Sequence, residues 1–210
     1  MARNEDNQDQ VSDSVLDEAG SGVHEQTLEE LMELTYAEER REQALAELAS
    51  KPAVTTPQKI LIIGASWVGD MIMAQGLFIL LKRTRRDCHI TVLAPAWTEP
   101  LLARMPEVDE SLVLPFDHGD LKLGERRRFG KSLADKGFTH AIVLPNSFKS
   151  ALIPRFAGIK ERIGWRGEAR GLLLNDCRRL DKTKYPRMVE RFAALGFSAK
   201  SRLPERVPDP

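Results

Sequence analysis

The segment from Gly64 to Asp70 is the first place where residue types and spacing suggest chemistry. Gly64 and Gly69 would let the backbone turn tightly and approach a ligand, and the helix that follows would offer free N–H groups to an anion. Asp70 falls in the first turn of that helix, where its carboxylate could take a proton from a substrate hydroxyl. Capping of the helix is the alternative role, because Asp is favoured there. The segment is neither GxGxxG nor a P-loop, which requires Lys at position 70.

A second group of candidates is basic. Arg126, Arg127 and Arg128 are consecutive, and Lys131 follows within one helical turn. Guanidinium groups bind phosphate and carboxylate in a bidentate manner, so the group suits an anionic ligand. A solvated helix face is the alternative. Nucleic acid is not an expected partner, because aromatic residues make up only 6% of the chain and only Phe129 lies among these cations.

Two further loops carry polar side chains. The first contains Asn146, Ser147, Lys149 and Ser150, and the second contains Trp165, Arg166 and Arg170. Hydrogen-bond donors with positive charge suit a sugar that carries hydroxyl and carboxylate groups. The alternatives are an Asn or Ser helix cap with an exposed Lys149, and a Trp165 that fills the core rather than stacking on a sugar.

The elements that must position these residues alternate between β-rich and helical segments. Strands are expected at residues 59–63, 89–94, 112–115, 139–144 and 160–164. Helices are expected at residues 70–83, 125–136, 147–156 and 186–195. This alternation predicts an α/β fold with a Rossmann-like, doubly wound parallel sheet. In such sheets ligands bind outside the carboxyl ends of the strands, which is where all the candidate loops fall.

Charge and composition divide the chain. Residues 1–59 hold 14 Asp and Glu against 5 Lys and Arg, whereas the rest holds 17 against 26. We interpret residues 1–58 as an acidic extension and linker, partly disordered, with one helix over 27–48. We expect residues 59–200 to form the Rossmann-like domain, and we interpret the proline-rich residues 201–210 as the start of an interdomain linker. Taken alone, the positive charge of residues 60–210 is compatible with an anionic partner, whether a phosphorylated metabolite, nucleic acid or a membrane surface, and an ordinary charged surface is the alternative.

Several classes of protein are not indicated. No apolar run reaches the 18 to 20 or so residues of a membrane span, and the acidic N-terminus does not resemble a secretion signal, so a cytoplasmic protein is expected. Cys88 and Cys177 lack CxxC spacing, which indicates reduced structural thiols rather than a disulfide framework or zinc site. No Asp-x-Asp pair is present to hold a divalent metal, and no Ser/His/Asp triad is evident.

Six motifs carry a resemblance to a known family. They are Ile-Gly-Ala-Ser-Trp-Val-Gly-Asp-Met (63–71), Leu-Ala-Pro-Ala-Trp (93–97), Arg-Met-Pro-Glu-Val (104–108), Gly-Glu-Arg-Arg (124–127), Val-Leu-Pro-Asn-Ser-Phe-Lys-Ser-Ala-Leu (143–152) and Gly-Trp-Arg-Gly-Glu (164–168). In this order they resemble the N-terminal half of the ADP-heptose:lipopolysaccharide heptosyltransferases of glycosyltransferase family 9. The similarity runs from about residue 59 to about residue 195.

The resemblance implies the acceptor-binding domain of a GT-B glycosyltransferase, whose C-terminal donor domain binds ADP-heptose. It implies an inverting, metal-independent transfer without a cofactor, in which Asp70 is the base. The acceptor residues that it implies are Ser66, Trp67, Arg126, Arg127, Arg128, Asn146, Ser147, Lys149 and Arg166. The acceptor would be the anionic inner core of lipopolysaccharide, heptosyl-Kdo-lipid A, at the cytoplasmic face of the inner membrane, where the protein would be peripheral. Nucleic acid is not expected as a partner.

The resemblance also leaves alternatives open. The donor domain is absent from residues 1–210, so this chain alone is expected to have little or no transferase activity unless that domain is supplied in cis or in trans. A non-catalytic module that keeps the acceptor site is one alternative. A generic α/β nucleotide-binding enzyme is another, and tight binding of ADP by this chain alone would favour it.

Overall fold

The computed structural model describes residue 40 and residues 57–208, except for 86, 117, 118 and 205. The chain divides into two compact units, residues 1–46 and 47–210, and the fold below is that of the second unit. The expectations for residues 1–56, an acidic extension with one helix over 27–48 and a linker from residue 51, lie outside the described residues, apart from a helical Arg40.

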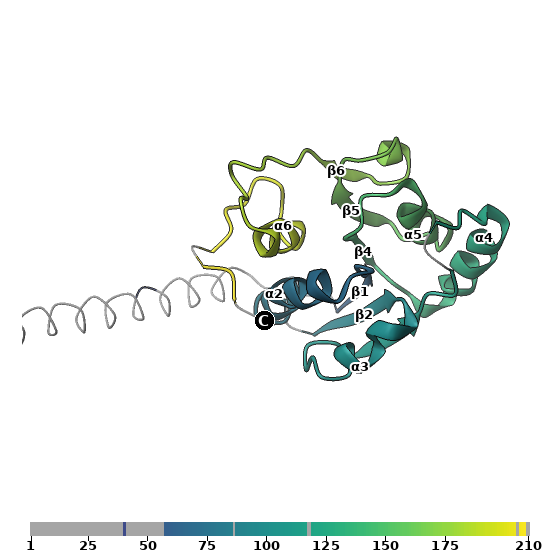
Figure 1. Ribbon diagram of the computed structural model, residues 1–210, viewed down its shortest axis with the longest axis horizontal. Helices are drawn as coiled ribbons and strands as arrows, with labels where there is room; N and C mark the ends of the chain where they lie inside the picture. The colour runs from purple at the N-terminus through teal and green to yellow at the C-terminus, as the bar shows by residue number, and fades with distance from the viewer. Residues whose placement is uncertain (1–39, 41–56, 86, 117–118, 205, 209–210) are drawn as a thin grey trace, which may run out of the picture. The chain divides into compact units, whose positions relative to one another are not determined.

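Six parallel strands form the centre of the domain (Figure 1). They are β1 (Gln58–Ile63), β2 (Cys88–Ala94), β3 (Glu110–Val113), β4 (His140–Val143), β5 (Glu161–Trp165) and β6 (Asp176–Arg178). Their order across the sheet is β3-β2-β1-β4-β5-β6, with β1 paired in parallel to both β2 and β4. The chain therefore reverses direction across the sheet at β1 and β4, and the expected doubly wound α/β fold is confirmed.

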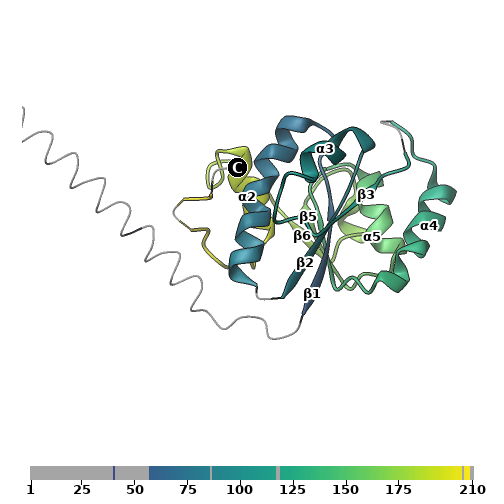
Figure 2. The same cartoon turned by 90° about the horizontal axis from the view of Figure 1, so that it is seen from below.

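Helices cover both faces of this sheet (Figure 2). They are α2 (Val68–Thr84), α3 (Glu99–Leu102), α4 (Leu123–Ser132), α5 (Leu152–Phe156) and α6 (Met188–Leu195). Successive side chains of β1 point to opposite faces. Ile60 and Ile62 pack with residues of α2, α3 and α6, whereas Leu61 and Ile63 pack with residues of α5 and the segment before it. This explains why β1 is a continuous apolar run rather than an alternating one.

The predicted helix over residues 147–156 is two elements. Phe148–Ala151 is a 3₁₀ helix, and α5 follows it at Leu152. Pro154 has no N–H to donate to the carbonyl group of Ser150, so a continuous α-helix over residues 147–156 would lack this hydrogen bond, whereas Pro154 is tolerated in the first turn of α5. In the same way the predicted helix over residues 125–136 is α4 followed by a 3₁₀ turn (Ala134–Lys136), which ends at Gly137 with a φ of 71°.

The sequence did not indicate β6 or α3. Strand β6 has only three residues, Asp-Cys-Arg, and pairs with β5 through Ile163–Asp176, Gly164–Cys177 and Trp165–Arg178. Three mostly polar residues are too few to show the alternation that predicts a strand. Only the pairing with β5 identifies this segment as a strand.

The proline-rich tail packs against the domain. Val207 is buried and lies in a small apolar cluster with Leu80 of α2 and Ala193 of α6. A Cβ atom added to Gly76 would lie 2.9 Å from the carbonyl oxygen of Pro208, so the tail approaches α2 closely. Residues up to 208 are thus part of the surface of this domain, and a role as interdomain linker stays a prediction.

Candidate active site

A cavity of about 640 Å³ lies outside the carboxyl ends of β1, β2, β4 and β5. Its walls are the loops that follow these strands, together with residues of α2, α4 and α6. Of the ten catalytic and acceptor residues that the resemblance implies, seven line it: Ser66, Trp67, Asp70, Arg126, Asn146, Ser147 and Lys149. Three others, Arg127, Arg128 and Arg166, are not part of its lining.

Asp70 lies in the first turn of α2 and is half-buried in the cavity wall. The residue at the N-cap of α2 is Trp67, three positions earlier, and α2 has no side-chain capping hydrogen bond. Within the part of the chain that the structure describes, the Asp70 carboxylate has no hydrogen bond or ion pair. It is therefore available to a ligand in the cavity, whereas a capping carboxylate would be occupied by backbone N–H groups.

The two glycines before Asp70 differ in their roles. A Cβ atom on Gly64 would lie 2.7 Å from Met71 Cε and 3.0 Å from Ala94 Cβ, so glycine fits here without displacing these side chains of α2 and β2. The expectation for Gly69 was wrong. It is the second residue of α2, it lacks a positive φ, and a Cβ atom would meet nothing within 4 Å.

The three consecutive arginines do not form one ligand-facing cluster, because successive residues of a helix point about 100° apart. Arg126 is only 3% exposed. Its Nε and Nη2 donate to the carbonyl oxygens of Leu121 (2.8 Å) and Asp120 (2.9 Å), and its guanidinium lies 4.3 Å from the ring centre of Phe116. Burial lowers the pKa of Arg126 from its usual value. Arg127 and Arg128 are exposed on the outer side of α4.

Two cations that the sequence analysis missed also reach the cavity, Lys182 and Arg191. Both lie beyond β6, and no motif marked them. Nε and Nη2 of Arg191 donate to the carbonyl oxygens of Tyr185 (3.0 Å) and Pro186 (2.7 Å). By contrast, the ammonium groups of Lys149 and Lys182 make no hydrogen bond or ion pair with the described residues, although Lys149 attracts Asp120 electrostatically. These two ammonium groups are the lining cations best able to meet an anionic ligand.

Charged side chains of both signs therefore face this cavity. Among the described residues, the cations in the lining are Arg126, Lys149, Lys182 and Arg191, and the carboxylates are Asp70 and Glu168. The excess of cations favours an anionic ligand. Asn146 adds an amide, and Ser147 a hydroxyl with no partner among the described side chains. Such a mixture of cations, amide and hydroxyl suits a polyhydroxylated anion such as an acidic sugar.

Arg170 is completely buried and holds two walls of the cavity together. Its guanidinium donates to the carbonyl oxygens of Pro145 and Trp165, to Asn146 Oδ1 (3.0 Å) and to Ser150 Oγ (3.3 Å). Burial lowers the pKa of Arg170 from its usual value. Because the Asn146 oxygen is occupied in this way, its NH₂ group remains to donate into the cavity.

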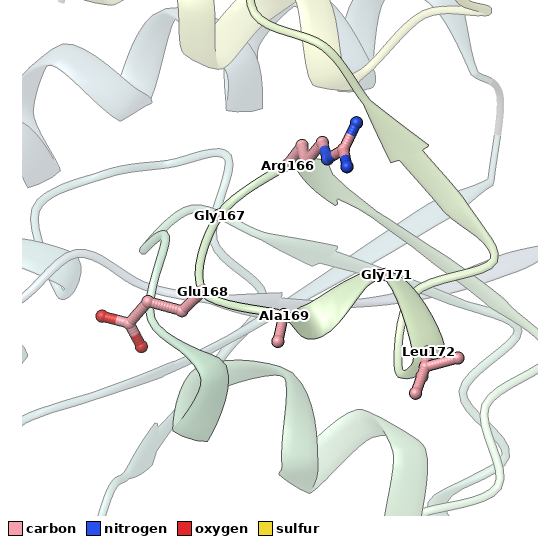
Figure 3. Close-up of a pocket in the computed structure, with 6 residues that line it drawn as sticks. All are labelled: Arg166, Gly167, Glu168, Ala169, Gly171 and Leu172. Atoms are coloured by element: carbon pink, nitrogen blue, oxygen red, sulfur yellow. The ribbon is translucent and has the colours of Figure 1, made fainter.

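Arg166 lies outside this cavity, in a shallower hollow of about 450 Å³ formed by its own loop, residues 166–172 (Figure 3). Figure 3 shows the side chains of Arg166 and Glu168 pointing to different sides of the loop. The Glu168 carboxylate accepts from the backbone N–H of Phe148 at 2.7 Å and lines the main cavity. The loop is thereby joined to the one that carries Asn146 and Lys149.

Trp165 is 5% exposed and donates from Nε1 to the carbonyl oxygen of Arg191 at 3.0 Å, so it packs mainly in the core. Cys88 and Cys177 are free thiols, and burial raises the pKa of Cys88. In the described residues, no three His, Cys, Asp or Glu side chains gather where they could hold a metal ion. No helix of that part of the chain is long and apolar enough to cross a bilayer.

Comparison with known proteins gives consistent matches. Residues 126–209 match the model of glycosyltransferase family 9 (heptosyltransferase). The chain is 59% identical over 139 residues to lipopolysaccharide heptosyltransferase 2 of Salmonella typhimurium and 58% identical over 139 residues to that of Escherichia coli. Each alignment covers 66% of this chain and 40% of the relative, so the chain spans less than half the length of these relatives.

A solved structure agrees with these relatives. The structure of Escherichia coli ADP-heptose lps heptosyltransferase II superposes with a TM-score of 0.68 and 50% identity, over 73% of this chain and 46% of that chain. In both sequence and fold the described domain is thus similar to one family, the heptosyltransferases of glycosyltransferase family 9.

Proposed function

We propose that this chain is the acceptor-binding half of a lipopolysaccharide heptosyltransferase of type 2. The observation that carries the proposal is the Asp70 carboxylate, which has no described partner and lies at the carboxyl edge of the sheet in a cavity that Lys149 and Lys182 also line. The names of the relatives, lipopolysaccharide heptosyltransferase 2, support the reaction class. The donor would be ADP-heptose, held mainly by the further length that these relatives possess.

In the proposed reaction Asp70 removes the proton from a hydroxyl group of the acceptor heptose. The acceptor oxygen forms a bond to the anomeric carbon of the donor, and the bond from that carbon to the diphosphate oxygen breaks. ADP leaves with the electron pair of that bond, and the proton stays on the Asp70 carboxylate. Attack from the side opposite the diphosphate inverts the anomeric centre. We propose that this step needs no metal ion or cofactor.

The remaining side chains would orient the acceptor. Lys149 and Lys182 would bind its carboxylates or phosphates, and Asn146 and Ser147 its hydroxyl groups. Because Arg126 is engaged with backbone carbonyls, its proposed contribution is to shape the wall and add positive charge. The acceptor in the proposal is the heptosyl-Kdo-lipid A inner core, which would place the protein at the cytoplasmic face of the inner membrane.

A chimera tests this proposal. The chain is joined to the second half of the Escherichia coli relative, and ADP release is measured with ADP-heptose and heptosylated Kdo-lipid A. We expect Asp70→Asn to lower kcat by about 10²–10⁴-fold with little change in KM, because the amide keeps the shape of the carboxylate but cannot accept the proton. Asp135→Asn, at an exposed site on another element, is the matched control and should leave kcat unchanged.

Three results would contradict the proposal. An Asp70→Asn chimera with full kcat would exclude Asp70 as the base. Saturable acceptor binding without ADP release, in a chimera whose donor half binds ADP-heptose, would instead indicate a non-catalytic acceptor-binding module. Tight ADP binding by the 210-residue chain alone would favour a different nucleotide-binding enzyme.

A further inference from the structure

The outer face of α4 is basic and has no described partner. Arg126 and Gly130, one turn apart, face inward, where a Cβ atom on Gly130 would lie 2.6 Å from Phe156 Cβ. Arg127, Arg128 and Lys131 are exposed on the opposite side and make no hydrogen bond or ion pair with the described residues. Glu125 is the single acidic residue of α4.

Two exposed leucines adjoin this face. Leu121 and Leu123 are 51% and 50% exposed, on either side of Lys122 where the chain enters α4. Folded domains bury most of their leucine side chains, so a pair of half-exposed leucines beside three cations is a feature to explain. Trp67 and Trp97 are exposed as well, but they line the cavity and belong to the candidate site.

Leu121 is linked to the wall of the cavity. The carbonyl oxygen of Leu121 accepts from Arg126 Nε at 2.8 Å, and Arg126 itself lines the cavity. A surface that took up Leu121 and Leu123 would therefore lie beside the opening through which an acceptor must enter.

We propose that Leu121, Leu123, Arg127, Arg128 and Lys131 form a docking surface for an anionic lipid bilayer. The leucines enter the interfacial region of the bilayer, and the three cations bind lipid phosphates around them. Charge complementarity and apolar insertion together match a bilayer, whereas a soluble anion would use the cations alone. The inference rests on the proposed function in one respect, because it explains how a lipid-linked acceptor would be brought to the cavity.

Vesicle sedimentation of the full chain tests the surface. With vesicles of equal parts phosphatidylglycerol and phosphatidylcholine we expect binding that weakens as salt is raised, and with phosphatidylcholine alone we expect no sedimentation. Arg127→Glu with Arg128→Glu should lower partitioning by at least about tenfold. Leu121→Ser with Leu123→Ser should lower it by at least about fivefold.

The control pair is Arg83→Glu with Arg104→Glu, which makes the same change in charge at exposed sites without described side-chain partners on other elements. It should keep partitioning within about twofold of the parent chain. Partitioning of either test pair equal to that of the parent, or an equal loss in the control, would overturn the proposal.

A second measurement separates this surface from the acceptor site. The Leu121→Ser, Leu123→Ser variant should bind the deacylated, water-soluble acceptor oligosaccharide as the parent chain does. If the parent binds vesicles as described but not this oligosaccharide, the proposed acceptor site fails while the docking surface stands. If the variant keeps vesicle binding and the parent binds the oligosaccharide, the docking surface fails alone.

Discussion

Arg170 shows how a single residue positions the candidate site. Its buried guanidinium has carbonyl, amide and hydroxyl oxygens as hydrogen-bond partners, and Glu168 attracts it electrostatically without forming an ion pair. Planar donors on three nitrogens can reach Pro145, Asn146 and Trp165 at once, which the single ammonium of lysine cannot do. Arg170 is thus a positioning residue, which fixes the loops after β4 and β5 relative to each other.

We expect Arg170→Lys to lower the free energy of unfolding by about 3 kcal/mol, because buried carbonyl oxygens lose their donors. Urea denaturation followed by circular dichroism measures the change. Arg166→Lys, in the same loop but exposed, is the control and should change stability by less than about 0.5 kcal/mol. Equal stabilities of the two variants would show that the guanidinium geometry of Arg170 is not needed.

Part of the candidate site could be predicted at the residue level. Asp70 lies in the first turn of the helix after β1, and Asn146 and Lys149 lie in the segment after β4. Because the carboxyl ends of parallel strands meet at one edge, the place of these residues in the cavity follows from a topological rule. Lys182 and Arg191 could not be found in this way. They reach the cavity because the chain returns over the sheet after β6, and that path depends on tertiary packing.

Two glycines of α4 give a prediction at the scale of the element. A Cβ atom on Gly130 would lie 2.6 Å from Phe156 Cβ and 2.9 Å from the carbonyl oxygen of Ile153, so α4 packs on α5 at a distance that only glycine permits. Gly130→Ala should destabilise the domain by about 1–3 kcal/mol in a thermal or urea unfolding experiment. The added methyl group would press against the backbone oxygen of Ile153 and the Cβ atom of Phe156, and neither atom can move aside easily.

Gly124 is the matched control within the same helix. A Cβ atom there would meet nothing within 4 Å, so Gly124→Ala should stabilise the domain by up to about 1 kcal/mol through helix propensity. If Gly130→Ala were as stable as Gly124→Ala, the close packing of α4 on α5 would be wrong.

The edge strand β3 supplies a pH-dependent contact. Glu110 Oε1 lies 2.6 Å from Lys136 Nζ, and this hydrogen bond holds the pKa of the Glu110 carboxyl below its usual value of 4.5. Because the folded-state pKa is the lower one, the contact stabilises the domain above pH 4.5, and that contribution is lost as the pH falls through the folded-state pKa.

Glu110→Gln should therefore cost about 0.5–1 kcal/mol at neutral pH, a modest value because both side chains are partly exposed. The difference from the parent chain should shrink as the pH falls below 4.5 in urea titrations. Asp135→Asn, at an exposed carboxylate without a described partner, is the control and should change stability by less than about 0.5 kcal/mol at neutral pH. A Glu110→Gln effect of constant size between pH 3 and pH 7 would contradict the assigned contact.

Elements could be predicted where composition is decisive. The apolar runs of β1, β2 and β4 and the glycine that ends the segment after α4 are local signals, and these elements were found within a few residues. Strand β6 and the division of the 147–156 helix were missed. Strand β6 exists only through its pairing with β5, and the division of the helix depends on the absent N–H of Pro154.

At the scale of the whole molecule, charge connects the candidate site to its ligand. Residues 60–210 hold 26 Lys and Arg against 17 Asp and Glu, and four of the cations line the cavity. An anionic acceptor should therefore bind with an affinity that falls as ionic strength rises, since exposed charges are screened beyond about 10 Å at 0.1 M salt. Lys149 and Lys182, whose ammonium groups make no ion pair with the described residues, should carry most of this dependence.

We expect Lys149→Glu and Lys182→Glu each to weaken binding of the deacylated acceptor to the 210-residue chain by about tenfold or more, because a cation that meets the ligand becomes a repelling carboxylate. Isothermal titration calorimetry at two salt concentrations measures both the affinity and its salt dependence. Arg104→Glu, which changes the charge equally on an exposed surface outside the cavity lining, should have a much smaller effect. If all three variants bound the acceptor equally, the attraction would come from the net charge of the domain rather than from the cations of the cavity. The assignment of Lys149 and Lys182 to the acceptor would then be wrong.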